Sequence, residues 1–285
     1  MTHFLMVVTA AVLWGCWSLF LRPSGLSGPQ CAFVAMAVMS LPAPLLWRQW
    51  ARADGRARRA LVLLGLADTG NLILYFAAVQ RGPVSVAVLT HYLAPLLVAL
   101  SAPWLLGERR SARALLAAPL TLGGLALVLG GRGGFSLETA LLGGGSALFF
   151  AAIILCSKDA ARAFTPLAVT ALHAPLSALG VLAVYGGEAL PGALGPGVAL
   201  VVLGSGVCGA LGNTLFNRGL RHVSTSAAGA LIYLEPLAAS AVGWAVFGEA
   251  LGPWGLLGGM LVLGAGAWVA AERPAAPRLQ LYAGS

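Results

Sequence analysis

Apolar positions dominate this chain in long runs, and short polar or basic stretches separate one run from the next. A helix of roughly 20 residues, rising about 1.5 Å per residue, crosses about 30 Å of hydrocarbon, and each run is about that long. The pattern predicts an all-α integral membrane protein with ten transmembrane helices. We expect them at residues 4–21, 30–47, 61–80, 84–106, 114–131, 137–157, 165–186, 196–217, 224–247 and 254–271.

One motif occurs twice, 141 residues apart, as Tyr92-Leu-Ala-Pro-Leu96 and Tyr233-Leu-Glu-Pro-Leu237. Gly107-Glu108 and Gly248-Glu249 match at the same offset. Several matches at one offset indicate a duplication. We therefore predict two five-helix repeats, at residues 1–132 and 133–272, joined at the glycine-rich run 130–134. Residues 273–285 are expected to form a mobile cytoplasmic tail.

An odd number of spans in each repeat has a consequence for topology. The second repeat would enter the membrane from the side opposite to the first, so the two copies would form inverted repeats around a central cavity. This architecture is typical of secondary transporters, whose substrate sites lie near the midplane where the repeats meet.

Charge is scarce, and its placement indicates topology rather than a nucleic-acid partner. Hydrophobic residues make up 59% of the chain and charged residues 9%, which excludes an ordinary soluble domain. The net charge is +8, yet 14 of the 17 Lys and Arg residues fall in alternate connections or the C-terminal tail. Because cytoplasmic loops carry the excess of Lys and Arg, we expect both termini in the cytoplasm and contacts with anionic membrane lipid.

The remaining composition points to a bacterial inner membrane and offers no cofactor or metal site. The N-terminus lacks a signal-peptide pattern, so residues 4–21 are expected to be retained as the first span. The four cysteines lie inside spans without metal-ligand spacing. Sixteen Arg against one Lys is typical of a GC-rich bacterial genome.

Ten spans, two five-span halves and a proline within the fourth span of each half resemble the EamA type of the drug/metabolite transporter superfamily. The resemblance covers essentially the whole chain and rests on Pro95, Pro236, Glu108 and Glu249. It implies a secondary transporter that exports small metabolites by alternating access. A bacterial aromatic amino acid exporter is the most similar member, so the implied substrate is amino acid-like.

Other functions remain open from the residues alone. The chain can carry another metabolite class, such as a nucleotide sugar, a nucleobase or a drug-like compound, or it can be a channel or a membrane enzyme. An enzyme needs a clustered nucleophile, base or metal set, and the histidines are scattered. No paired basic residues lie inside spans to hold phosphates. Proton antiport and facilitated diffusion both fit the sequence, as do a monomer and an oligomer.

The two motif prolines are expected to kink their helices. A proline inside a helix removes one backbone hydrogen bond, so Pro95 would free the carbonyl of His91 and Pro236 that of Ile232. In lipid, a freed carbonyl is tolerated where it lines a water-filled cavity. The symmetric pair favours kinked helices that line the cavity, against the alternative of kinks that only shape packing.

Glu235 and Asp68 are the acidic residues predicted deep inside spans. Intramembrane charges usually face the interior and serve a function. Glu235 can hold a substrate ammonium or carry a proton, and Asp68 shares a helical face with Asn71 and Tyr75. The alternative for each acid is a protonated carboxyl satisfied within the bundle.

Small polar and aromatic residues mark further candidate faces for substrate. Interhelical packing is the alternative for each of them. In the first and sixth spans, these faces combine aromatic walls with hydroxyls, which suits a ligand with a flat side chain and a polar head. These candidate faces are Trp14, Trp17 and Ser18 in the first span, Ser146, Phe149, Phe150, Ile153 and Ser157 in the sixth, and Gly206, Gly209, Asn213, Phe216 and Asn217 in the eighth.

His91 and the motif tyrosines Tyr92 and Tyr233 complete the candidate substrate contacts. His91 lies near mid-span and can bind substrate or titrate, with a satisfied bundle histidine as the alternative. His173 is expected to be structural. Glu108 and Glu249 close their helices at opposite faces, where we expect each to pair with an arginine across a gate.

Overall fold

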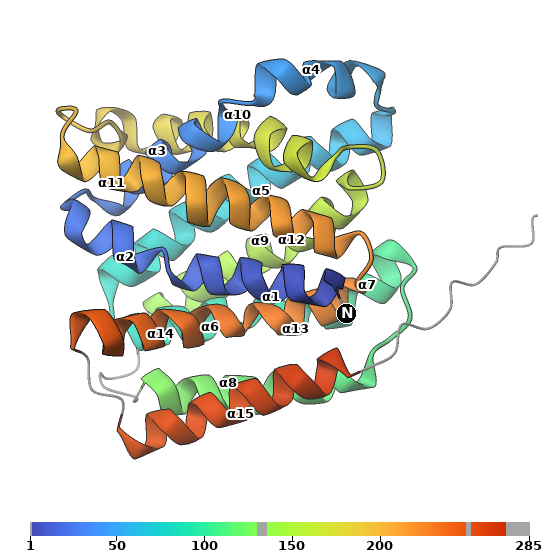
Figure 1. The fold of residues 1–285 in the computed structure, drawn as a ribbon, viewed down its shortest axis with the longest axis vertical. Coiled ribbons are helices and arrows are strands. Elements are labelled where there is room, and N and C mark those ends of the chain that lie inside the picture. Colours follow the sequence, from blue (N-terminus) through green and yellow to red (C-terminus); the bar gives the residue numbers. More distant parts are fainter. Residues whose placement is uncertain (1, 130–135, 249–251, 272–285) are drawn as a thin grey trace, which may run out of the picture.

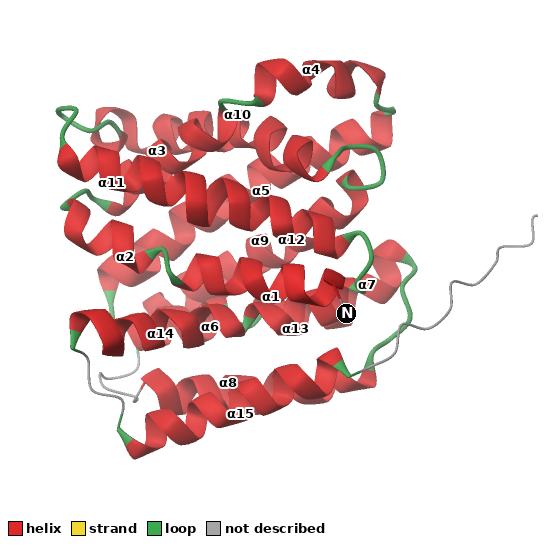
Figure 2. Ribbon diagram, viewed as in Figure 1, coloured by secondary structure: helices red, strands yellow, loops and turns green. Residues whose placement is uncertain are grey.

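The computed structural model describes residues 2–129, 136–248 and 252–271. All the regular secondary structure in these described residues is helical, as Figures 1 and 2 show. The predictions for Glu249, for the 130–134 joint and for the 273–285 tail lie outside the described residues. The helical fold class of the sequence prediction is confirmed.

The first half of the chain forms eight α-helices and one short 3-10 helix. Their bounds are α1 (Thr2–Gly15), α2 (Ser18–Leu21), η1 (Arg22–Ser24), α3 (Gly28–Ser40), α4 (Ala43–Arg52), α5 (Gly55–Arg81), α6 (Val84–His91), α7 (Ala94–Leu106) and α8 (Ala112–Leu129). Side-chain caps set two of the starts. Ser27 and Gln30 form a capping box before α3, and Asp54 accepts from the Ala57 amide before α5.

The second half has a similar series of elements. Its elements are α9 (Leu137–Ala160), α10 (Pro166–Tyr185), η2 (Gly186–Ala189), α11 (Pro196–Gly204), the π-helical turn η3 (Ser205–Leu211), α12 (Gly212–Leu220), α13 (Thr225–Ile232), α14 (Leu234–Phe247) and α15 (Pro253–Ala270). Ser136, Thr165 and Ser224 cap α9, α10 and α13 by accepting a backbone amide three residues on.

Eight segments of the described residues are long and apolar enough to cross a membrane. They cover all the predicted spans except the second and the tenth. The second corresponds to α3 and α4, which meet at 68° and raise the number of spans to nine if they count as one. The tenth falls on α15, which is apolar but shorter. Ten crossings therefore stay a prediction.

Prolines cause the bend in the second predicted span. Leu41 and Pro42 separate α3 from α4, and Pro44 follows in the first turn of α4. Proline cannot donate a helical hydrogen bond, and its ring clashes with the carbonyl four residues earlier. After the bend, α4 exposes Leu45 and Trp47 and carries Arg48 and Arg52, a composition that suits a helix lying at a membrane surface.

The long helices lie side by side, and their connections alternate between two ends of the molecule. In Figure 1 the N-terminus and the α4–α5, α7–α8 and α12–α13 connections all lie at the right. The η1–α3 and α5–α6 connections lie at the left. The arginine-rich connections thus gather at one end, which we call the basic end. This grouping is the arrangement that the charge pattern predicted.

Helices from the two halves pack against each other in exchanged pairs. From the first half, α1 contacts α12 and α14, whereas from the second half α9 contacts α5, α6 and α7. α3 contacts α10, and α8 contacts α15 to form one edge of the bundle in Figure 1. The halves are therefore interleaved rather than placed side by side as separate domains.

Glycines allow several of these helices to approach closely. A Cβ added at Gly15 of α1 would lie 2.5 Å from the Glu235 carbonyl oxygen of α14. A Cβ at Gly258 would lie 2.2 Å from the Gly124 carbonyl oxygen, where α15 crosses α8. Small residues at such crossings are typical of membrane helices, because lipid supplies no hydrophobic force to drive them together.

Large apolar side chains are exposed on the outer surface of the bundle. They occur on helices from both halves, for example Leu63, Trp104, Leu141, Trp244 and Met260. An apolar surface of this extent is incompatible with water and suits a lipid environment. The buried core consists largely of alanine, valine and leucine at the helix contacts.

Candidate functional site

The two copies of the repeated motif interrupt their spans at equivalent positions. α6 ends at His91 and α7 begins at Ala94, while α13 ends at Ile232 and α14 begins at Leu234. Pro95 and Pro236 therefore lie in the first turn of a new helix, where a missing N–H removes no helical hydrogen bond. The helices are interrupted two or three residues before each proline, and each pair still forms one candidate span, so the predicted kinks stay a prediction.

The glycine of each repeated Gly-Glu pair also has one structural role. Gly107 ends α7 and Gly248 ends α14, both in the left-handed conformation, with φ of 68° and 70°. Glycine is favoured there because it has no Cβ. The two matches at an offset of 141 thus mark the same break and the same helix end in both halves.

A cavity of about 320 Å³ lies beside these breaks and receives side chains from both halves. Residues of α1, α2, α3, α5 and α6 line it from the first half, and residues of α9, α12 and α14 from the second. Aromatic rings and two carboxyl groups dominate its wall. The lining contains no Lys and no Arg.

Most of the predicted substrate contacts meet in this cavity. The residues brought together are Trp14, Trp17, Asp68, Asn71, Tyr75, His91, Phe150, Asn213, Phe216 and Glu235. Ser18, Tyr92, Asn217 and Tyr233 are not part of the lining. Ser18 donates to the Gly15 carbonyl of α1, and Asn217 donates to Thr170 of α10. Whether any of them contacts substrate stays a prediction.

His91 is held rigidly at the end of α6. Its ring stacks on Phe150 at 4.8 Å between centroids, and Tyr75 packs at 4.5 Å. The Ser146 hydroxyl donates its one proton to the Gly143 carbonyl at 2.7 Å, so it must accept at 2.8 Å from His91 Nδ1. In the neutral ring this leaves Nε2 as the acceptor nitrogen.

Asp68 faces a histidine across the interface of α5 and α10. The His173 Nδ1 atom lies 2.7 Å from the Val169 carbonyl and must donate to it, since a carbonyl can only accept. His173 Nε2 then faces Asp68 Oδ2 at 3.5 Å. Two acceptors at this distance repel each other unless a proton resides on one of them. Asp68 Oδ2 and Asn71 Oδ1 are both buried without a hydrogen-bond partner.

Glu235 projects into the cavity from the first turn of α14. The Tyr92 hydroxyl forms a hydrogen bond with its carboxyl group, and Tyr75 is close enough to interact with that group electrostatically. Tyr92 and Tyr233 approach each other with ring centroids 6.2 Å apart, and the Tyr233 hydroxyl has no partner. The motif tyrosines thus pack behind the cavity wall, with Tyr92 supporting the carboxyl.

Two glycines of the eighth predicted span make room for the tryptophan walls. A Cβ at Gly209 would lie 3.0 Å from the Trp17 ring, and one at Gly212 would lie 2.9 Å from Trp14 Nε1. Gly209 belongs to the π-helical turn η3, and π-helical turns are frequent at functional sites. Of the two glycines predicted on this face, Gly209 accommodates the Trp17 ring, whereas a Cβ at Gly206 would meet open space.

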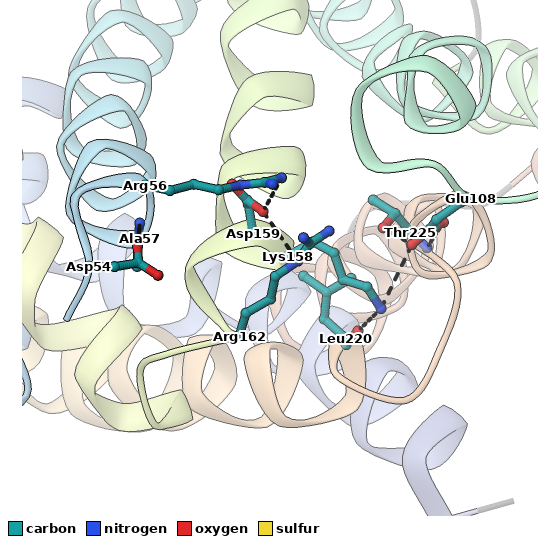
Figure 3. Close-up of polar contacts among 9 residues, drawn as sticks. All are labelled: Asp54, Arg56, Ala57, Glu108, Lys158, Asp159, Arg162, Leu220 and Thr225. Atoms are coloured by element: carbon teal, nitrogen blue, oxygen red, sulfur yellow. Dashed lines mark hydrogen bonds and ion pairs between the residues drawn. The ribbon is translucent and has the colours of Figure 1, made fainter. Parts of the chain in front are cut away.

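A cluster of charges closes the basic end of the bundle (Figure 3). Glu108 accepts from the amide and the hydroxyl of Thr225, each at 2.7 Å, and lies 3.8 Å from Lys158. Lys158 also donates to the Leu220 and Val223 carbonyls. The predicted partner of Glu108 was an arginine. The observed partner is lysine, because α9 ends beside the carbonyls that terminate α12.

A second ion pair in Figure 3 ties α5 to α9. Arg56 donates twice to Asp159, at 3.0 and 2.9 Å, and Arg162 lies 3.2 Å from the same carboxylate. The two clusters together connect the basic ends of α5, α7, α9, α12 and α13. We call the Glu108–Lys158–Thr225 contacts the latch.

Comparison with known proteins places these features in a family. The EamA-like transporter family matches residues 1–130 and 138–270. The chain belongs to the EamA-like transporter family. An uncharacterized transporter of Archaeoglobus fulgidus is 31% identical over 258 residues, which cover 90% of this chain and 92% of that protein. A solved crystal structure with 23% identity superposes with a TM-score of 0.75 over 94% of this chain and 97% of its own.

Membership identifies the protein as a multi-pass membrane transporter of the drug/metabolite type. The superposed structure supports the fold alone, because its sequence identity is low. The resemblance drawn from the repeated motif is therefore confirmed at the level of the family. The specific likeness to an aromatic amino acid exporter is not part of that result.

Part of the cavity of this EamA-like transporter had no signal in the sequence. The second predicted span contributes Cys31, Ala32, Ala35, Met36 and Met39, which look like ordinary apolar residues. Leu72 and Phe76 extend the face of α5 that Asp68 and Tyr75 already marked. Leu72 and Phe76 follow Asp68 by four and eight residues, so helical periodicity would have placed them on the same face. The α3 residues could be identified only once the packing of α3 against the cavity was known.

Proposed function

We propose that this chain is a secondary transporter of a bacterial inner membrane that exports small amino acid-like metabolites, with aromatic amino acids as the first candidates. The observation that carries the proposal is the cavity beside the two helix interruptions, which is lined by residues from both halves. Its aromatic walls suit a flat apolar side chain, and Glu235 and Asp68 suit an amino group.

We also propose that the two halves are inverted repeats that alternate around this cavity. The exchanged helix contacts support the proposal. α1, the first span of one half, packs against α14 of the other, and α9 packs against α6 and α7 in the reciprocal way. A two-fold relation between the halves would produce this pattern. Rocking of one half against the other would then open the cavity to each side in turn.

The basic end is proposed to face the cytoplasm, with both termini on that side. The arginine-rich connections support this orientation, since cytoplasmic loops carry the excess of Lys and Arg. The latch then lies at the cytoplasmic face and joins α7, α9 and α13. In this proposal it is the gate that keeps the cavity closed toward the cytoplasm, and its opening admits substrate for export.

Counterflow in proteoliposomes tests the transport proposal. Vesicles preloaded with unlabelled phenylalanine should accumulate labelled phenylalanine, saturably and transiently. Glu235→Gln keeps the size of the side chain and removes its charge, and we expect at least a tenfold loss of initial rate. Glu138→Gln is the matched control, because Glu138 is exposed and pairs with Arg81 outside the cavity.

Two outcomes would contradict the proposal. Flux that does not saturate and that reaches ionic rates would indicate a channel. Absence of exchange for every aromatic amino acid, in vesicles whose protein is monodisperse and correctly oriented, would remove this substrate class. A screen of sugars, nucleobases and nucleotide sugars in the same vesicles would then identify the metabolite.

A further inference from the structure

We infer that the cavity recognises an organic ammonium group attached to an aromatic or apolar body, and that it does not require a carboxylate on the substrate. The inference rests on the proposed function, because it takes the cavity to be the transport site. It defines the substrate class more narrowly, as amphipathic amines.

Charge balance in the cavity is the first argument. Glu235 and Asp68 are the two acidic side chains of its lining, and no Lys or Arg accompanies them. A substrate carboxylate would enter as a third acidic group with no cation to compensate it. In a low-dielectric interior, attraction and repulsion between charges are much stronger than in water. The wall therefore favours a positive ligand.

Unpaired acceptors are the second argument. Asp68 Oδ2 and Asn71 Oδ1 are buried and have no hydrogen-bond partner, although His173 Nε2 lies 3.5 Å from Asp68 Oδ2. They are three residues apart on α5, and both residues line the cavity. Buried acceptors without donors are costly, and an ammonium group carries three donors and no acceptor. A protonated amine is thus the ligand group that supplies what these atoms lack.

Two of the side-chain donors in the cavity lining, Asn213 and His91, are already engaged within the protein. Asn213 Nδ2 donates to the Gly209 carbonyl at 2.9 Å. His91 Nδ1 donates to Ser146 at 2.8 Å, which leaves an acceptor nitrogen on the neutral ring. Asn217, a predicted substrate contact outside the cavity lining, donates to Thr170 at 3.2 Å instead. Two asparagines and the histidine therefore offer a substrate carboxylate little.

The aromatic wall completes the argument. Trp14, Trp17, Tyr75, Phe150 and Phe216 line the same space as the two carboxyl groups. The faces of aromatic rings attract cations, and cages of such rings are a recurring solution for ammonium ligands. The same faces accommodate a flat apolar body. Acidic groups and aromatic rings in one cavity favour a ligand that is both cationic and amphipathic.

A matched ligand trio tests the inference directly. 2-Phenylethylamine, phenylalanine and 3-phenylpropionate share the ring and differ in the head group. Isothermal titration of the full-length protein in detergent at neutral pH measures each affinity. We expect the amine to bind at least as tightly as phenylalanine and at least tenfold more tightly than the propionate. Equal or tighter binding of the propionate, or no binding of the amine, would overturn the inference.

Variants assign the site. Glu235→Gln and Asp68→Asn should each weaken binding of 2-phenylethylamine by fivefold or more, while Glu138→Gln should bind like the wild type. Glu235→Asp should retain most of the affinity, because it keeps the charge. Amine binding that is unchanged in both Glu235→Gln and Asp68→Asn would overturn the assignment. If a variant is not monodisperse, the ligand trio on the wild-type protein still decides.

The transport proposal and this inference fail separately. Vesicles that exchange phenylalanine while the propionate competes as well as the amine would refute the ammonium preference and keep the carrier. Tight and selective binding of the amine without exchange of any compound would refute the carrier and keep the head-group preference.

Discussion

The two broken spans share a backbone but differ in chemistry. Each stops at a motif tyrosine, resumes before a proline and ends at a left-handed glycine. In the first copy, His91 and Ala94 occupy the positions that Ile232 and Glu235 occupy in the second. One copy thus presents a histidine held by Ser146, and the other presents a carboxyl group supported by Tyr92.

This difference indicates which features of the repeat serve the fold and which serve the substrate. The break, the proline and the glycine recur because both halves need the same interruption and the same helix end. His91 and Glu235 do not recur, because Ile232 and Ala94 occupy the equivalent positions. Experiments that exchange or perturb the two copies therefore separate architecture from recognition.

The largest effect is expected from placing the acid in the wrong copy. Ala94 has no exposed surface, and Ala94→Glu would bury a carboxyl group without a partner. We expect destabilisation by several kcal/mol, so the protein should lose its monodisperse elution in detergent. Fluorescence-detected size exclusion measures this, with Ala94→Ser as the conservative control.

The reciprocal change should leave the fold intact. Glu235→Ala removes a carboxyl group that lines the cavity and opens no gap in the helix contacts. We expect normal elution, a thermal midpoint within about 2 °C of the wild type, and loss of counterflow. If Ala94→Glu instead folds and restores counterflow to Glu235→Ala, the two copies are interchangeable and the comparison is wrong.

A smaller effect is expected at two glycines that contact an interrupted span of the other half, Gly15 of α1 against α14 and Gly143 of α9 against α6. A Cβ at Gly15 meets the Glu235 carbonyl at 2.5 Å and the Ala239 amide at 2.8 Å. A Cβ at Gly143 meets the Thr90 hydroxyl first, at 2.0 Å. We expect Gly15→Ala to destabilise by about 2 kcal/mol, because the backbone of α14 must shift. Thermal unfolding in detergent measures this.

A rescue variant distinguishes the two contacts. Thr90→Ala removes the nearest obstacle to a methyl group at position 143, so it should recover part of the stability that Gly143→Ala loses. No single side-chain deletion can rescue Gly15→Ala, because its nearest obstacle is the Glu235 carbonyl oxygen at 2.5 Å, whereas the nearest backbone atom at Gly143 is the Ala87 carbonyl oxygen at 2.9 Å. Equal behaviour of the two glycine variants would show that the contacts are equivalent after all.

The sequence was sufficient for the helical membrane class and for the family, because these depend on signals that are visible in one dimension. Run length, alternating arginine and the repeated motif predicted helical spans and the grouping of basic connections. The motif did not reveal that each proline lies in the first turn of a new helix. That outcome depends on tertiary packing, which lets Pro95 and Pro236 begin a helix instead of interrupting one.

Prediction of the cavity succeeded where polarity was unusual and failed where it was not. Asp68, His91 and Glu235 stand out in apolar surroundings and all line the cavity. Cys31 and Met39 line it as well, but nothing distinguishes them from lipid-facing residues in the sequence. The pairing of His173 with Asp68 was also missed, because 105 positions separate them and only the contact of α5 with α10 brings them together.

The two ends of the bundle offer a finer comparison between ion pairs. Lys158 and Glu108 of the latch are largely buried, whereas Arg81 and Glu138 at the other end are both about 60% exposed. Lys158→Met leaves the Leu220 and Val223 carbonyls without their donor, and we expect a loss of about 1 kcal/mol in unfolding free energy. Arg81→Met should cost less than about 0.5 kcal/mol.

Function adds a second test of the latch. If it is the cytoplasmic gate, Lys158→Met should change the rate of counterflow and leave the affinity for substrate unchanged, whereas Arg81→Met should change neither. A weaker substrate affinity in Lys158→Met would argue that the latch shapes the cavity instead of closing it.

The smallest expected effect concerns pH at the basic end. His222, in the α12–α13 connection, stacks on His3 with ring centroids 3.9 Å apart. Desolvation, followed by His3 and the cations Arg221, Lys158 and Arg218, lowers the pKa of His222, whose side chain is exposed. A histidine whose pKa is depressed in the folded state binds a proton less readily than it does when unfolded. Its contribution to stability is therefore complete above the unfolded pKa and is lost as the pH falls through the folded one.

We expect a small decrease in the thermal midpoint between pH 7.5 and 5, and this decrease should be smaller in His222→Gln. An identical pH profile in that variant would assign the decrease to other groups.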